Sequence, residues 1–164
     1  MPLFCMAQSQ QTLLAGLRRV VTDPARETLE FIKRDVLNLA LRNTDNHARN
    51  TAVQRTPEGF VQLTPLFDFA PMFKDPEVVP RSCHWRDKAG VRQADWHQVI
   101  EQLEVPDTER TAIAAHLAEF AKVVARLEVI ALDYGVDRDV IEACAKAIET
   151  QARQLADLAG TPHG

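Results

Sequence analysis

Glycine is scarce in this chain, and no long apolar run interrupts its polar sequence. Six glycines are dispersed over 164 residues, so no glycine-rich loop is available to cradle phosphate groups. No apolar run approaches the roughly 18 residues that a membrane-spanning helix needs. The N-terminus also has no basic leader before its short apolar patch, which excludes a signal peptide. We therefore expect a cytoplasmic protein without a membrane segment.

Cysteine and positive charge are also in short supply. The three cysteines, Cys5, Cys83 and Cys144, lie far apart. Their number and spacing favour reduced thiols that fill apolar space over a disulfide framework or a zinc cluster. The 19 basic residues are scattered and outnumbered by 23 acidic ones, which gives a formal net charge of -4. Because such a surface does not attract phosphate backbones or anionic membranes in general, autonomous nucleic-acid binding is not expected.

Helical periodicity, in contrast, is present over much of the chain. With 46% hydrophobic residues the chain can bury one core, and we predict a single domain over 1–164. Asp23 and Pro24 are typical of a helix start, and apolar residues at helical spacing follow until Asn43 stops the helix. The predicted apolar stripe of this helix consists of Leu29, Ile32, Val36, Leu37, Leu39 and Leu41.

The C-terminal part of the sequence predicts a helical region over 95–158. The segment "ADWHQVIEQL" is a short amphipathic helix, and Asp107 caps a long helix that continues until Gly135. Asp137 or Asp139 then starts the last helix. The residues predicted to be buried in these two longer helices are Ile113, Leu117, Phe120, Ala121, Val124, Leu127, Ala131, Val140, Ile141, Cys144, Ile148, Leu155 and Leu158.

The middle of the chain differs in character. Two short segments rich in β-formers, "NTAVQ" and "GFVQLTP", flank the turn sequence "RTPEG" and predict a β-hairpin. Phe67 and Phe69 are expected to anchor the following loop in the core. The polar, proline-bearing stretch 74–90 predicts a long surface loop. The predicted fold class is therefore mainly α, with a small β-hairpin beside the loop that precedes it.

That preceding loop, "NTDNHARN" at 43–50, concentrates hydrogen-bonding side chains. Asp45 is followed by Asn50 five residues later and by Asp68 after the hairpin. Phosphoryl transfer needs a group that orients the attacking hydroxyl and oxygen ligands that hold magnesium against the phosphates. Magnesium prefers carboxylate and amide oxygens, and the catalytic loop of protein kinases has the same aspartate-to-asparagine spacing. The spacing therefore favours a phosphotransferase site.

The stretches "NTDNHARN" and "LTPLFDFAPM" resemble the signature of the HipA-type toxin kinases, bacterial serine/threonine kinases with a protein-kinase-like fold. The resemblance covers about residues 28–73 and implies that the chain is the helical C-terminal lobe of such a kinase, with a catalytic loop at 43–50 and a metal loop at 66–71. It implies that Asp45 is the catalytic base, that Asn50 and Asp68 coordinate Mg2+ and so bind ATP, and that His47 supports the transferred phosphoryl group.

The resemblance also implies partners. Family members belong to toxin-antitoxin systems, are neutralised by a DNA-binding antitoxin and phosphorylate proteins such as glutamyl-tRNA synthetase. They carry an N-terminal lobe with a phosphate-covering loop and a nucleotide-binding lysine, neither of which has a counterpart before Asp45 in this sequence. We therefore expect little or no kinase activity from this chain alone, and an antitoxin or a separate N-lobe chain as its partner. Self-association is expected from N-terminal apolar residues, namely Leu3, Phe4, Leu13, Leu14, Leu17, Val20 and Val21.

Plainer interpretations stay open. Asp45 and Asn50 are residue types that commonly satisfy backbone groups where a helix ends, and His47 taken alone suits a structural role better than a phosphate contact. The "CHW" at 83–85 lacks a second pair of metal ligands. The alternative function is a non-catalytic remnant, a module that binds an antitoxin or another protein.

Overall fold

The computed structural model describes residues 9–74 and 80–160. Within these residues the chain is mainly helical, with one two-stranded antiparallel sheet, as the sequence predicts. None of these helices is long and apolar enough to cross a bilayer. In chain order, the elements are α1 (Gln10–Arg18), α2 (Pro24–Ala40), η2 (Ala48–Asn50), β1 (Val53–Arg55), β2 (Val61–Leu63), η3 (Met72–Lys74), α3 (Trp96–Glu101), α4 (Asp107–Val124), α5 (Leu127–Asp133), α6 (Arg138–Glu142), α7 (Ala145–Asp157) and η4 (Leu158–Gly160).

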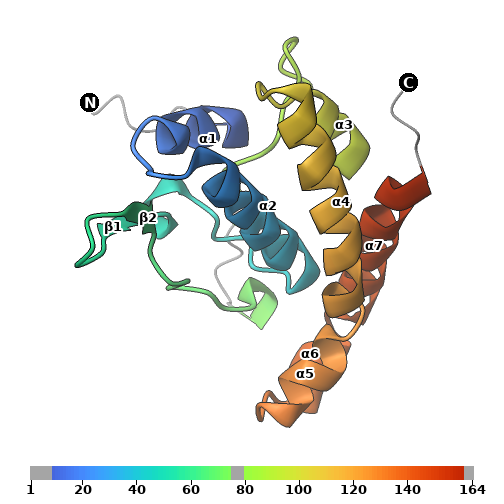
Figure 1. Cartoon of the computed structure of the whole chain (residues 1–164). Helices are drawn as coiled ribbons and strands as arrows, with labels where there is room; N and C mark the ends of the chain where they lie inside the picture. Colours follow the sequence, from blue (N-terminus) through green and yellow to red (C-terminus); the bar gives the residue numbers. More distant parts are fainter. Residues whose placement is uncertain (1–8, 75–79, 161–164) are drawn as a thin grey trace.

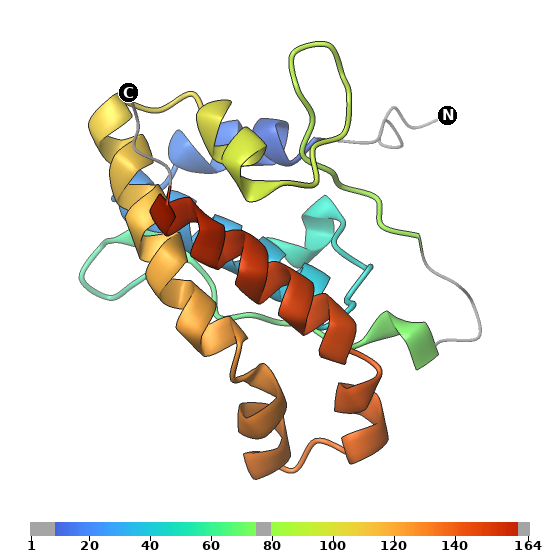
Figure 2. The ribbon, with the colours of Figure 1, turned by 90° about the vertical axis from the view of Figure 1, so that its right-hand side faces the viewer.

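Three helices, α2, α4 and α7, pack against one another and form the centre of the core. Figure 1 shows α4 and α7 beside α2, with α1 and the hairpin on its other side. In the view of Figure 2, α7 lies across the front of α2. The contacts bury side chains completely, because Ile32, Val36, Leu117, Val124 and Leu155 each have no exposed surface.

Helix α2 begins where the sequence predicts and positions the loop that follows it. The Asp23 side chain accepts a hydrogen bond from the Arg26 backbone N–H at 3.0 Å, and Pro24 occupies the first turn. The predicted stripe is only partly buried, because the leucines at 29, 37, 39 and 41 are half-exposed. The helix ends at Ala40 rather than at Asn43, and Arg42 follows in the left-handed region with a φ of 55°.

The prediction of one continuous helix from Asp107 to Gly135 is wrong. The helix breaks after Val124, and the last helix breaks in the same way between α6 and α7. In Figures 1 and 2, α5 and α6 extend beyond the lower ends of α4 and α7. No residue of α5 is fully buried, and Leu127, Ala131 and Leu132 pack only partly buried against the core. The apolar spacing of the sequence therefore predicts more burial than this segment has. Gly135 does end α5, with a φ of 82°.

The predicted surface loop at 74–90 is also wrong in part. Residues 75–79 of that stretch lie outside the described residues, but Cys83 and Trp85 are each only 3% exposed. The Trp85 ring packs edge-to-face against Phe31 and Trp96. Alternate residues point inward along extended backbone, and residues 81–85 follow this pattern. We call them the Arg81–Trp85 strap, and its backbone pairs through His84 with Ser9 at the start of α1.

Three of the N-terminal apolar residues within the described part of the chain belong to its own core. Leu14, Leu17 and Val21 are buried, whereas Leu3, Phe4 and Cys5 lie outside the described residues. Val20 is 54% exposed. The described part therefore offers less apolar surface for self-association than the sequence suggests.

Candidate active site

The four residues that the sequence singles out line the same pocket. Asp45 and His47 lie on the irregular stretch between α2 and η2, Asn50 ends η2, and Asp68 follows β2. The hairpin pairs Val53 with Leu63, so the residues after β2 come back beside the residues that precede β1. The predicted metal loop at 66–71 thereby lies beside the predicted catalytic loop at 43–50, although the two are separated by a complete hairpin in the sequence.

Hydrogen bonds within the catalytic loop set the direction of its side chains. The Asn50 amide Nδ2 donates to the backbone carbonyl of Asp45 at 2.7 Å, which leaves the amide oxygen as the atom that Asn50 can offer to a cation. The Asp45 carboxylate Oδ1 lies 3.3 Å from His47 Nε2. His47 Nδ1 is buried and has no hydrogen-bond partner within residues 9–74 and 80–160.

Asp68 stands in an unusual backbone conformation. Its φ is 51°, in the left-handed region that aspartate tolerates better than bulky residues do. Its neighbours Leu66 and Phe67 also line the pocket and are 43% and 42% exposed. The expectation that Phe67 anchors in the core is therefore wrong, because a large part of its side chain stays exposed; Phe69 is half-buried.

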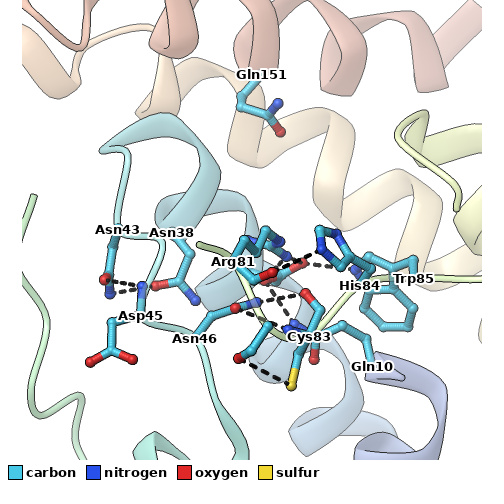
Figure 3. A network of polar contacts seen from close by, with 12 residues as sticks. Gln10, Asn38, Asn43, Asp45, Asn46, Arg81, Cys83, His84, Trp85 and Gln151 are labelled. Atoms are coloured by element: carbon cyan, nitrogen blue, oxygen red, sulfur yellow. Dashed lines mark hydrogen bonds and ion pairs between the residues drawn. The ribbon is translucent and has the colours of Figure 1, made fainter. Parts of the chain in front are cut away.

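Amide side chains fix the catalytic loop to its surroundings (Figure 3). Asn43 donates through Nδ2 to Asn38 Oδ1 at 2.9 Å, and its own Oδ1 accepts from the Asp45 N–H at 3.2 Å. Asn46 donates to the Cys83 carbonyl at 2.9 Å and accepts from the Cys83 N–H at 3.3 Å. In Figure 3 the Asp45 carboxylate points away from Asn46 and Cys83, so the supports leave it accessible.

Asp35 also lines this pocket, although the sequence motif does not point to it. Asp35 is 2% exposed and accepts hydrogen bonds from Gln10 at 3.0 Å, from Arg81 at 2.6 and 2.7 Å, and from the Trp85 indole at 2.8 Å. One signal was available: a carboxylate inside the apolar stripe of α2 must find such partners, because burial of an unpaired charge is very costly. Its partners, however, could not be identified from spacing.

The donor set at the pocket fits magnesium. No group of three or more His, Cys, Asp or Glu side chains among the described residues is arranged to hold a metal. Magnesium does not require one, since it usually takes one or two protein oxygens together with phosphate oxygens and water. The Asn50 amide oxygen and the Asp68 carboxylate are groups of this kind, and both residues line the same pocket.

Burial shifts the pKa of three groups outside the four pocket residues. Burial raises the pKa of the Cys83 and Cys144 thiols, which keeps them protonated and unreactive and agrees with their predicted role as apolar fillers. Burial also lowers the pKa of His84, with a smaller contribution from the positive charge of Arg92. His84 Nε2 lies 3.0 Å from the Arg81 carbonyl.

Comparison with known families gives a match over most of the chain. The sequence model of the HipA-like C-terminal domain family matches residues 5–152. No curated protein sequence matches the chain. The matched range contains all four predicted pocket residues and extends well beyond the stretch 28–73 that carries the motif.

Proposed function

The chain belongs to the HipA-like C-terminal domain family, and from this premise we propose that it is the phosphoryl-transfer lobe of a serine/threonine protein kinase. The observation that carries the proposal is that Asp45, Asn50 and Asp68 line one pocket. A base and two oxygen ligands in one cleft are the groups that phosphoryl transfer from Mg-ATP requires. The family match supports the kinase relationship.

Each pocket residue has a distinct part in this proposal. The Asp45 carboxylate orients the acceptor hydroxyl and accepts its proton, with His47 Nε2 close enough, at 3.3 Å, to hold the carboxylate in place. Asn50 and Asp68 hold the magnesium ion of Mg-ATP through oxygen atoms. When bound, this ion neutralises charge on the phosphate oxygens.

The nucleotide also needs a cover, which the described residues do not supply. Their one sheet has two strands, and the exposed Leu66 and Phe67 beside the pocket present an apolar surface of the kind that partners bury. We propose that a nucleotide-binding lobe, from elsewhere in the same protein or from a second chain, packs over this face. An antitoxin and a protein substrate are the further partners in this proposal.

Calorimetry with ATP and Mg2+ tests the assignment of the metal ligands. Wild-type chain should bind Mg-ATP more tightly than ATP without metal, whereas Asp68→Asn and Asn50→Ala should lose this dependence on Mg2+. The matched control is Asp133→Asn, because Asp133 is an exposed aspartate at the end of α5, far along the chain from the pocket. Mg-ATP binding that is equal in all four proteins would contradict the proposal.

A second titration separates the two functions that the sequence leaves open. If the chain is a kinase lobe, addition of a nucleotide-binding lobe should tighten Mg-ATP binding and give phosphoryl transfer that Asp45→Asn abolishes. If Mg-ATP fails to bind both with and without that lobe, the pocket belongs to a non-catalytic module that binds a partner protein.

A further inference from the structure

Asn46 ties the catalytic loop to a distant segment of the chain. It is only 7% exposed, and both polar atoms of its amide bond the backbone of Cys83, the nitrogen to the carbonyl and the oxygen to the N–H. The two residues are 37 positions apart. Asn46 directly follows Asp45, so this pair of bonds fixes the backbone next to the proposed base.

We call the two hydrogen bonds between the Asn46 amide and the Cys83 backbone the clamp. The segment that contains Cys83 is itself anchored on both sides. On one side of Cys83 the Arg81 guanidinium pairs with Asp35, and on the other side the Trp85 indole donates to the same carboxylate. Asp35 lies on α2, in the centre of the core. The clamp therefore connects the catalytic loop to a rigid point in the fold, by way of a short segment that is held at both ends.

Resting on the proposed function, we propose that Asn46 is a positioning residue that holds Asp45 and Asn50 in the geometry that binds Mg-ATP. Asn43 fixes only the start of the loop against α2, and the bond from Asn50 to Asp45 lies within the loop. The amide of Asn46 connects the middle of the loop to the Arg81–Trp85 strap. Without it, the loop visits other conformations, and Mg-ATP must select the competent one.

Truncation of the side chain is the first test. If the loop without its clamp keeps the competent geometry about a tenth of the time, the Kd of Asn46→Ala for Mg-ATP rises about tenfold. The matched control is Gln151→Ala, since Gln151 is a second amide that is 7% exposed and is hydrogen-bonded to a buried group, the Trp96 indole. Figure 3 shows Gln151 apart from the network, on α7. This control should lose stability but keep the wild-type Kd.

A second variant tests the hydrogen bonds themselves, through the pH dependence of the Kd for Mg-ATP. A side chain that only fills space would not affect this pH dependence. In Asn46→Asp the carboxylate can accept from the Cys83 N–H but cannot donate to its carbonyl, so binding should be weaker than in wild type at pH 8. Protonation restores the donor, and burial raises the pKa of such a carboxyl. The ratio of its Kd to the wild-type Kd should therefore fall toward one as the pH is lowered to 5.5. The Asp35–Arg81 pair and the pocket carboxylates are present in both proteins, so the ratio compares the two side chains at position 46 on the same background at each pH.

Hydrogen exchange of the wild-type chain provides a measurement that needs no variant. Cys83 is not among the residues that line the pocket, yet Mg-ATP should slow exchange of its N–H, because a ligand that requires the clamp disfavours the opening that exposes this group. Unchanged exchange at Cys83, or equal Kd values for Asn46→Ala and wild type, would overturn the role of Asn46 and leave the proposed function standing. Absence of Mg-ATP binding by wild type, both with and without a nucleotide-binding lobe, would instead remove the proposed function itself.

Discussion

At the scale of single residues, the site depends on a buried charge that does not take part in the proposed chemistry. Asp35 is 2% exposed and receives hydrogen bonds from Gln10, Arg81 and Trp85. A buried carboxylate is tolerated only when its lone pairs are satisfied in this way. One side chain of α2 thus holds α1 and the Arg81–Trp85 strap together, and the strap in turn holds the catalytic loop.

Asp35→Ala should be among the most destabilising single changes in the chain. It leaves the guanidinium of Arg81, whose side chain is 13% exposed, without its counter-charge, and loss of one partner of a buried pair costs about 3–5 kcal/mol. The measurement is the free energy of unfolding in urea. Asp133→Ala, at an exposed position, is the control and should stay within about 0.5 kcal/mol of wild type; a similarly small effect of Asp35→Ala would show that the network contributes little.

His84 should make stability depend on pH. Its ordinary pKa is 6.5 and burial lowers it in the folded chain, so the unfolded chain takes up a proton first as the pH falls. The contribution of His84 is therefore complete above pH 6.5 and is lost as the pH drops through the lower folded pKa. Urea midpoints between pH 7.5 and 5 should fall less steeply in His84→Gln than in wild type. The exposed His116 gives the control His116→Gln, which should keep the wild-type slope; parallel curves for all three proteins would rule out this role of His84.

The residue types of the pocket could be predicted from sequence, but their supports could not. The separations between Asp45, Asn50 and Asp68 along the chain can be read directly from the sequence. A short hairpin is enough to bring these residues together. Asn46 and Cys83 meet across 37 positions, and nothing in the local sequence indicates that pairing. The sequence predicts that Phe67, beside Asp68, anchors this loop in the core, yet Phe67 is 42% exposed.

At the scale of secondary-structure elements, the local sequence locates the starts of α2 and α4 to within a residue, but it does not locate the breaks within the C-terminal helices. Asp23 caps α2 through its side chain, as the Asp-Pro sequence predicts. Asp107 was predicted to cap α4 in the same way, but it is the first residue inside the helix, and Pro106 is the N-cap without a side-chain bond. The breaks after Val124 and Glu142 depend on where packing partners end, and apolar spacing alone does not contain that information.

The two aspartates should respond differently to the same substitution. Asp23→Ala removes the hydrogen bond to the Arg26 N–H, and loss of an N-cap costs about 1 kcal/mol. Asp107→Ala removes only an exposed ion pair with Arg110, which is worth about 0.3–0.5 kcal/mol on a helix surface. Thermal or urea unfolding of the two variants, which are matched in chemistry, checks this difference. A larger loss in Asp107→Ala than in Asp23→Ala would contradict the assignment of the caps.

At the scale of the whole molecule, the three central helices form the base on which the pocket stands. α2 carries Asp35 on the side of the pocket, while its opposite contacts with α4 and α7 fix its place in the core. The predicted catalytic loop follows the end of α2, and the hairpin brings the predicted metal loop back beside it. The Arg81–Trp85 strap, which comes later in the sequence, holds the catalytic loop through the bonds between Asn46 and Cys83. The mainly α fold could be predicted from periodicity, whereas this closure depends on contacts between distant segments.

Packing of α7 should therefore determine the stability of the entire chain. Leu155 has no exposed surface, and truncation of a fully buried leucine to alanine costs about 2–5 kcal/mol. Leu155→Ala should lower the free energy of unfolding, measured in urea, by that amount. Val129→Ala, on α5 at a position that is 53% exposed, should change it by no more than about 0.5 kcal/mol. Equal losses in the two variants would mean that α5 is as firmly packed as α7.

The most direct test of the proposed Mg-ATP site is a map of where a metal-nucleotide complex binds. Mn2+ with ATP can replace Mg-ATP, and as a paramagnetic ion it broadens the amide signals of nearby residues in NMR spectra of the chain. We predict that signals of residues 45–50 and 67–69 broaden together at low Mn-ATP concentration, and that Asp68→Asn removes both effects. Broadening confined to one of the two loops, or spread over the exposed acidic residues of other helices, would contradict a shared metal site at Asn50 and Asp68.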